Sequence, residues 1–170
     1  MNSKKVVLTV FVGLVILLAL FCQKPKDESI ANKAAIQQLV DEAWNKGNFA
    51  VVDELLSTNY VLHVDAPGAR KDREGYKQAI AMYRAAFPDF LFTIEDMIAV
   101  GDKVVIRCTM GGTHEGELMG VAPTGKKLSM TAIAIRRFED GKIVEEWVET
   151  NMLGVMQQMG VIPMPGKLTE

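Results

Sequence analysis

Between Arg136 and Gly160 the chain changes its hydrophobic periodicity twice, and this segment constrains the fold more than any other. The pair Asp140-Gly141 predicts a tight hairpin turn, because both residue types tolerate the positive φ values of two-residue turns. Strict alternation in the strand that follows predicts two faces. One face carries Ile143, Glu145, Trp147, Glu149 and Asn151, and the other carries Val144, Glu146, Val148 and Thr150. The first set mixes an indole with polar groups, which indicates a pocket wall rather than a plain core face.

From Asn151 the spacing becomes helical, with Asn151 as the expected N-cap and Gly160 as the stop. The predicted stripe along this helix is Met152, Val155, Met156 and Met159. A polar strand end therefore meets the start of a helix, and such junctions commonly border a pocket.

Upstream of this segment the pattern predicts helices first and strands afterwards. The expected helices cover 30–46, a short stretch capped by Asn48, and a third stretch from the cap Asp72 to about Phe87. The expected strands cover 60–64, 90–100, 103–113 and 128–138. This order predicts an α+β fold with the N-terminal helices packed on one side of a curved, mainly antiparallel sheet. Two layers of this kind leave a cavity wherever side chains do not fill the space between them.

Residues 1–22 have the pattern of an export signal, a basic start followed by an almost wholly apolar run. The run is shorter than the about 20 residues that a membrane-spanning helix needs. Its end, Leu18-Ala19-Leu20-Phe21-Cys22, resembles a bacterial lipobox, in which the cysteine receives lipid. Residues 23–31 form a polar tether, 32–160 the folded domain and 161–170 a tail. We expect a lipid-anchored protein of the bacterial cell envelope, with an uncleaved membrane anchor and ordinary secretion as alternatives.

Charge and cysteine usage argue against several classes of function. The net charge is -2, and no block of Lys or Arg is long enough to follow a phosphate backbone, so nucleic acid is not an expected partner. The two cysteines, Cys22 and Cys108, lie in such different settings that we expect no disulfide. Cys108 is interpreted as a small buried hydrophobe. No His/Cys spacing is typical of a zinc site, and we expect no metal.

Several motifs together resemble one known family. They are Ala86-Phe87-Pro88-Asp89, the run Gly112 to Gly120, Pro123-Thr124-Gly125-Lys126, the run Arg137 to Ile143, Glu145-x-Trp147-x-x-x-Asn151 and Gln158-Met159-Gly160. In this order, over roughly residues 32–160, they resemble the SnoaL-like polyketide cyclases, also called ester cyclases. The resemblance implies the cone-shaped α+β barrel shared by nuclear transport factor 2, ketosteroid isomerases and scytalone dehydratase.

The resemblance also implies ring closure by an intramolecular aldol reaction that uses no metal and no organic cofactor. Such a reaction needs a base beside a carbonyl and an acid for the developing oxyanion, and an aspartate in an apolar pocket can serve as both. In the family pattern that aspartate follows Trp-x-x-x, and here the position is Asn151. An amide can orient a substrate or cap a helix, but it cannot carry a proton.

Four residues are candidates to replace that aspartate: His63, His114, Glu145 and Glu149. Histidine is favoured, because its ordinary pKa of about 6.5 suits proton transfer. His114 could orient on the neighbouring Glu115, or could instead fix the shape of its Gly-rich loop. His63 could equally be a satisfied core residue.

The expected substrate-binding residues are Trp147, Glu145, Glu149, Met110 and Met130. The alternatives are core packing for the tryptophan and the methionines, and solvation for the glutamates. The leading hypothesis is a domain that binds a small apolar carbonyl compound in its cone and catalyses cyclisation or isomerisation by acid/base chemistry.

Two other functions remain open on the sequence. One is a non-catalytic envelope lipoprotein that uses the fold for ligand binding or dimerisation, and the other is a ketosteroid-isomerase-like enzyme, which the spacing of acids does not separately support. By analogy with other cone-shaped domains, which often pair through their sheets, we expect a homodimer.

Overall fold

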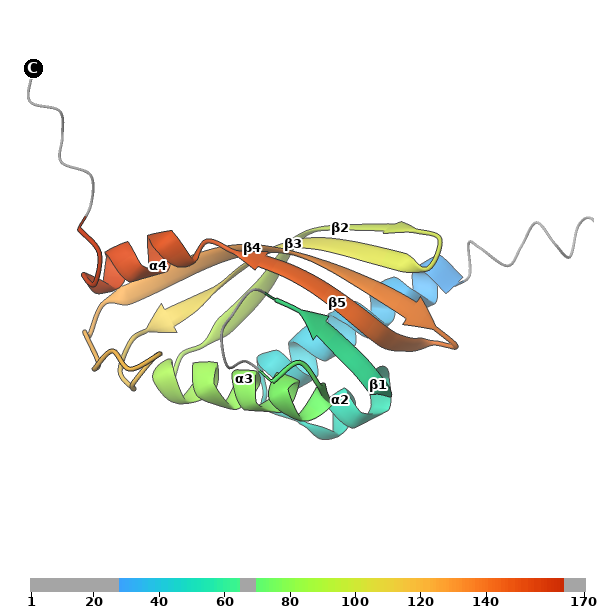
Figure 1. Cartoon of the computed structure of the whole chain (residues 1–170), viewed down its shortest axis with the longest axis horizontal. Coiled ribbons are helices and arrows are strands. Elements are labelled where there is room, and N and C mark those ends of the chain that lie inside the picture. The colour runs from blue at the N-terminus through green and yellow to red at the C-terminus, as the bar shows by residue number, and fades with distance from the viewer. Residues whose placement is uncertain (1–27, 65–69, 164–170) are drawn as a thin grey trace, which may run out of the picture.

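The computed structural model describes residues 28–64 and 70–163 as two layers, a five-stranded sheet and a set of helices over one of its faces (Figure 1). The predicted leader 1–22, with Cys22, lies outside the described residues, as do most of the tether and most of the tail. Within the described ranges no helix is long and apolar enough to cross a membrane.

The strands follow the order β1-β5-β4-β3-β2 across the sheet. Their bounds are Leu56–His63 for β1, Leu91–Val100 for β2, Lys103–Thr113 for β3, Lys127–Glu139 for β4 and Lys142–Thr150 for β5. The β1 strand pairs with β5 in parallel, and all other pairs are antiparallel. The predicted α+β fold on a curved, mainly antiparallel sheet is confirmed. The sheet stays open rather than closing into a barrel, with β1 and β2 at opposite edges.

The helical layer begins with residues 28–38, which are α-helical and continue directly into a π-helical turn, η1, at Leu39–Trp44. Two further helices, α2 (Ala50–Leu55) and α3 (Arg73–Ala86), complete the cover on what is here termed the inner face of the sheet (Figure 1). The opposite face is the outer face. The last helix, α4 (Met152–Met159), lies at one end of the sheet beside β4.

The predicted N-cap residues can be compared with the structure one helix at a time. Asp72 caps α3 as predicted, because its side chain accepts a hydrogen bond from the backbone N–H of Gly75 at 2.8 Å. The predicted Asn48 cap is wrong: Phe49 is the residue before α2, and no side chain caps that helix. The short α2 runs straight into β1, which therefore starts at Leu56 rather than at Tyr60. Leu56 is buried, so the strand extends toward the N-terminus beyond the predicted 60–64 to a side chain that packs in the core.

The turns agree more closely with the pattern. Asp140 and Gly141 have φ values of 50° and 74°, as the predicted two-residue hairpin requires. Gly101 and Asp102 form the turn between β2 and β3, and β3 has the bounds that were predicted.

A β-bulge changes the faces of β5. Phe138 pairs with Ile143, but the preceding residue Arg137 pairs with Glu145, so Val144 is an extra residue in β5. Beyond the bulge Glu146 and Val148 turn to the inner face, opposite Arg136 and Ala134. The predicted set that joined Ile143 to Glu145, Trp147 and Glu149 is therefore wrong. Ile143 faces the core, and those three residues lie on the outer face.

The α4 helix is fixed at both ends and along its side. The Asn151 side chain accepts from the N–H of Gly154 at 3.0 Å, and Gly160 ends the helix with a φ of 86°, both as predicted. Of the predicted stripe, Val155 and Met159 are buried. Beyond the end of β5, Gln158 takes the place of a neighbouring strand. It accepts from the N–H of Ser129 at 2.9 Å and donates to the Ser129 carbonyl at 2.8 Å.

Candidate functional site

His114 lies at the end of β3 in the loop that leads to β4, and it is the most completely buried polar residue, at 0% exposure. Its Nδ1 lies 3.0 Å from the Thr124 hydroxyl oxygen and 3.3 Å from the Thr124 backbone nitrogen, which donates to it. Since Nδ1 accepts, the proton of the neutral ring resides on Nε2. Nε2 has no hydrogen-bond partner within the described part of the chain. His114 therefore offers one N–H donor to whatever contacts it.

The backbone of the loop holds His114 in this position. The His114 N–H donates to the Lys126 carbonyl, and the Gly125 N–H donates to the His114 carbonyl, both at 2.9 Å. The loop is also attached to the end of α3, because Glu115 and Gly116 both donate to the Ala86 carbonyl. The His114 ring packs near Phe87, with ring centroids 5.8 Å apart.

The expected pairing of His114 with Glu115 is wrong, since Glu115 is exposed and Thr124 takes the ring nitrogen. The alternative interpretation, that His114 fixes the shape of its own loop, agrees with these contacts. This structural role leaves Nε2 available for another contact, because the loop residue Thr124 bonds only to Nδ1.

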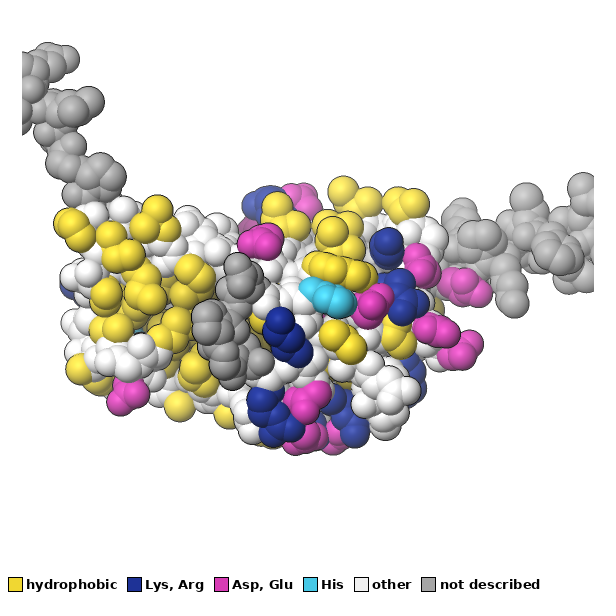
Figure 2. Space-filling model, viewed as in Figure 1, with side chains coloured by type: hydrophobic (Ala, Val, Ile, Leu, Met, Phe, Trp, Pro, Cys, Tyr) yellow, Lys and Arg dark blue, Asp and Glu magenta, His cyan; other side chains and the backbone are white. Residues whose placement is uncertain are grey.

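The inner face of the sheet near this loop is apolar. Met110 and Met130 pair across β3 and β4, and both are buried on the inner face where a ligand-lining role was predicted. The core that contains Met110 and Met130 also has half-buried apolar side chains packed against it from other elements, among them Leu62, Ala79, Met82, Tyr83, Val121, Val148 and Met156. Figure 2 shows hydrophobic side chains gathered on the surface at the α4 end of the molecule. The described side chains on the inner face at this end of the sheet are thus mainly apolar.

Asn151 lies at the junction of β5 and α4 and is exposed. Its N–H donates to the Thr131 carbonyl at 3.0 Å, and its side-chain oxygen caps α4. With Thr131, Ile133 and Glu149 it borders a depression of about 400 Å³. The residue at the position of the expected aspartate is therefore a structural cap open to solvent.

His63 and Trp147 form a pair on the outer face of the sheet. Their rings stack with centroids 4.8 Å apart and planes 7° apart. Glu145 lies beside them, 3.5 Å from His63 Nε2, and Arg137 Nε donates to the other Glu145 oxygen at 2.6 Å. The Arg137 guanidinium holds the pKa of Glu145 below its usual value, with a smaller contribution from His63. The structure does not bring His63, Trp147, Glu145 or Glu149 to the inner face with His114.

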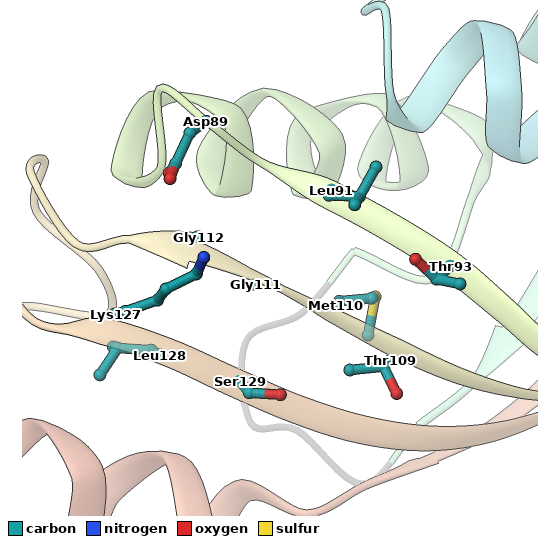
Figure 3. A pocket seen from close by; sticks show the side chains of 10 residues that line it. All are labelled: Asp89, Leu91, Thr93, Thr109, Met110, Gly111, Gly112, Lys127, Leu128 and Ser129. Carbon is teal, nitrogen blue, oxygen red and sulfur yellow. The ribbon is translucent and has the colours of Figure 1, made fainter.

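A second depression, of about 340 Å³, lies across β2, β3 and β4 (Figure 3). Its one carboxylate, Asp89, accepts from the Thr113 backbone N–H at 2.5 Å and from the Thr113 hydroxyl at 2.9 Å. These bonds lower the pKa of Asp89. Asp89 is thus engaged in fixing the end of β3, and the groove lacks a convergent set of reactive groups among the described residues.

The sequence reasoning missed a buried polar cluster, here termed the Arg136 cluster and made of Trp44, Tyr60, Tyr76, Arg136 and Glu146. Arg136 Nη2 lies 2.8 Å from Glu146 Oε1, and the Tyr60 hydroxyl donates to Glu146 Oε2 at 2.9 Å. The Trp44 indole N–H donates to the Tyr76 hydroxyl oxygen at 2.8 Å.

Within the Arg136 cluster the charged groups are Arg136 and Glu146, which form an ion pair, while the two tyrosines stay neutral. Burial raises the pKa values of Tyr60 and Tyr76 far above the ordinary value, so both phenols stay protonated. Burial alone would lower the pKa of Arg136, but the Glu146 carboxylate holds it above its usual value. One feature of the sequence could have indicated this cluster. Arg136 occupies the next inward-facing position of β4 after the buried residues Leu128, Met130, Ala132 and Ala134.

Comparison with known proteins gives a consistent picture. Residues 34–159 match the sequence profile of the family described as SnoaL-like polyketide cyclase. The nogalonic acid methyl ester cyclase of Streptomyces nogalater is 27% identical over 120 residues, which cover 69% of this chain and 90% of that protein.

Two solved structures resemble the fold closely. AclR of Streptomyces galilaeus, a proposed hydroxylase, is 29% identical, with a TM-score of 0.72 over 82% of this chain and 87% of its own. IdmH of Streptomyces antibioticus, a proposed polyketide cyclase, is 36% identical, with a TM-score of 0.66 over 76% of this chain and 98% of its own.

Proposed function

The chain belongs to the SnoaL-like polyketide cyclase family, and from that premise we propose that it binds a small apolar carbonyl compound in its cone and activates the carbonyl for cyclisation or isomerisation. The reaction would need no metal and no organic cofactor. His114 is the group that contacts the carbonyl oxygen, and the half-buried apolar side chains around it hold the rest of the molecule.

The observation that carries this proposal is the state of the His114 ring. Thr124 occupies Nδ1, so the proton resides on Nε2, which is buried and without a partner in the described ranges. A neutral imidazole N–H in a dry site is a strong electrophilic partner for an oxygen that gains negative charge. His114 acts as a hydrogen-bond donor, because Nδ1 is not available as a base.

Ring closure of this type breaks one C–H bond, forms one C–C bond and protonates one oxygen. Proton removal leaves an enolate, whose carbon attacks a second carbonyl of the same molecule, and the resulting alkoxide takes a proton. His114 Nε2–H can stabilise the enolate and the alkoxide by a hydrogen bond, and the proton that solvent took from carbon returns to the alkoxide. Position 151 is an amide and cannot take the C–H proton, so the proposal assigns that proton to solvent. Water is a weak base, so we expect slow turnover.

The test compares two histidines in one chain. Nogalonic acid methyl ester is the first compound to assay, because a relative is named for its cyclisation. A general readout is the exchange of α-hydrogens of 2-tetralone with D₂O, followed by NMR. His114→Ala should lower either rate by about 10² or more, whereas His63→Ala, on the outer face, should leave it within a factor of two or so of wild type.

Thr124→Val supplies a second test if His114→Ala folds poorly. It removes the hydroxyl that contacts Nδ1 and helps to orient the ring, while Thr124→Ser retains it. A loss of rate in the valine variant with recovery in the serine variant supports the proposal. Equal rates in wild type, His114→Ala and Thr124→Val would exclude it.

The leader and the assembly stay predictions. We propose lipidation at Cys22, attachment to the envelope membrane and a homodimer. Mass spectrometry of the protein extracted from its own membranes with mild detergent would report the lipid, the stoichiometry and any retained small molecule together.

A further inference from the structure

A depression of about 440 Å³ at the end of the sheet away from α4 is lined by four carboxylates. It lies where the start of the helix 28–38 meets the β2–β3 and β4–β5 turns (Figure 1). Its volume is in the range of small-molecule sites, roughly 300–1,000 Å³. The carboxylates belong to Glu28, Asp102, Glu139 and Asp140, and the site is here termed the acidic depression.

Three of these four carboxylates have no ion pair within the described ranges. The exception is Glu139, which lies 3.4 Å from Arg137 Nη1. The lysines next to the two turns are engaged elsewhere. Lys103 lies over a tryptophan ring on the outer face, and Lys142 donates to a backbone carbonyl of α2. The acidic depression therefore has a local excess of negative charge, which a bound cation would balance.

Asn32 is a second and independent feature of the acidic depression. It is only 8% exposed, and it borders the depression. No hydrogen bond joins its side chain to another residue in 28–64 or 70–163, although a buried amide costs free energy unless its hydrogen bonds are made. The amide oxygen accepts from N–H donors. A ligand that carries such donors would satisfy Asn32 and the carboxylates together.

The arrangement of the carboxylates narrows the choice of cation. A metal ion needs oxygen ligands that converge to within about 2.6 Å of one point. No three acidic groups of the described chain are grouped closely enough for that. They come from three separate segments, with the apolar side chains of Ala31 and Phe138 also in the lining. We propose that the acidic depression binds an aliphatic chain that carries two or more ammonium groups, as a polyamine does.

Two sources can supply such ammonium groups. One is a soluble polyamine. The other is the chain itself, because Lys24 and Lys26 stand just before Glu28 in the sequence, and a linked group has a high effective concentration. Both lysines lie outside the described residues, so a binding experiment has to distinguish the two sources.

The acidic depression is remote from His114. Thr113, next to His114, pairs with Lys127 at the start of β4, whereas Phe138 lies at the other end of that strand. At about 3.3 Å per residue, the steps from Lys127 to Phe138 correspond to roughly 36 Å of strand. The inference therefore does not depend on the proposed function at His114.

The experiment measures the affinity for spermidine by isothermal titration calorimetry, with full-length protein in mild detergent at about 0.15 M salt. Asp102→Asn with Asp140→Asn should weaken binding about 5-fold or more, because two carboxylate contacts are lost. Asparagine tolerates the positive φ of position 140, so this variant should fold. The matched control, Glu115→Gln with Glu117→Gln, changes the net charge equally on the exposed β3–β4 loop. It should stay within about a factor of two of wild type.

A charge-neutral variant separates a built site from a diffuse field. Asn32→Ala should weaken spermidine binding about 5-fold, because one hydrogen bond to a charged group is lost. 1-Butylamine, which has a single ammonium group, should bind about 10-fold more weakly than spermidine. Lys24→Gln with Lys26→Gln identifies the source. Tighter spermidine binding in this variant assigns the site to the chain's own lysines, and an unchanged affinity assigns it to a soluble polyamine.

Four results would overturn the inference. They are no binding of spermidine to wild type and to the Lys24→Gln, Lys26→Gln variant alike, equal affinities of wild type and the Asp102→Asn, Asp140→Asn variant, an equal loss in the control variant, or tighter binding of Ca²⁺ than of spermidine. His114→Ala should bind spermidine as wild type does. Failure of the proposed function and failure of this inference are therefore distinguishable.

Discussion

Arg136 and Glu146 face each other across β4 and β5 on the inner side of the sheet, 2.8 Å apart and almost wholly buried. Their proximity depends on the bulge at Val144, which turns Glu146 inward. Removal of one partner leaves the other charge buried and unbalanced. We expect Glu146→Ala to lower the free energy of unfolding by about 3–5 kcal/mol, measured by urea denaturation.

The matched control is the double change Arg136→Met with Glu146→Met. It should cost far less than either single change, because no charge is stranded in the core. A double variant as unstable as Glu146→Ala would mean that the pair contributes through packing rather than charge.

Deletion of Val144 should remove the bulge without changing any residue in the Arg136 cluster. Glu145 would then follow Ile143 directly, and plain alternation would keep Glu146 and Val148 on the inner face and Trp147 on the outer face. We therefore expect the ion pair to persist and the free energy of unfolding, measured by urea denaturation, to change by only about 1 kcal/mol. Val144→Thr keeps the bulge and should remain close to wild type. A deletion variant as unstable as Glu146→Ala would contradict the register assigned to β5.

The bulge also explains which parts of the fold the sequence predicted. Asp72, Asp140 and Gly141 act locally, and their caps and turns were predicted correctly because each depends on a few neighbouring residues. The faces of β5 were not, since the position of an extra residue depends on the register with β4. Strict alternation therefore assigned Glu145 and Trp147 to a pocket wall.

The candidate site was predicted in part for a related reason. His114 was identified from its motif, but its partner Thr124 is ten residues away across a loop, and the neighbouring Glu115 was the wrong choice. The Arg136 cluster joins five elements, so no short-range pattern shows it as a whole. Only Arg136 itself interrupts an apolar alternation visible in the sequence.

Acid should weaken the outer-face contacts of Glu145. Its pKa is lowered in the folded state by Arg137 and, to a smaller degree, by His63. A lowered folded pKa means that the stabilisation is present above the unfolded value of about 4.3 and is lost as the pH falls through the folded pKa. Urea midpoints between pH 7 and pH 2.5 should therefore fall less steeply for Glu145→Gln than for wild type.

Glu149 is the internal comparison for this pH effect. It lies on the same face of β5 but has no ion pair within the described part of the chain. Glu149→Gln should keep the wild-type slope. An identical slope for Glu145→Gln would contradict the assigned contacts.

Asn151→Asp tests the missing base. An aspartate at this position can keep the cap, because its carboxylate accepts from the Gly154 N–H as the amide oxygen does now. The variant should therefore fold as well as wild type. Its rate of α-hydrogen exchange or cyclisation should rise by about 10², the lower end of the usual contribution of a general base. The gain stays at that end because the capping bond and the start of α4 hold the pKa of the new carboxylate down.

The Asn151→Asp gain should depend on the hydrogen-bond donor at the other end of the reaction. In a His114→Ala background the new carboxylate removes a proton without a donor for the enolate, so the two changes should be strongly non-additive. The measurement is the exchange rate of the four proteins of this double-mutant cycle. Additive effects would mean that Asn151→Asp acts on a substrate that His114 does not contact, and the proposed cooperation between His114 and position 151 would have to be abandoned.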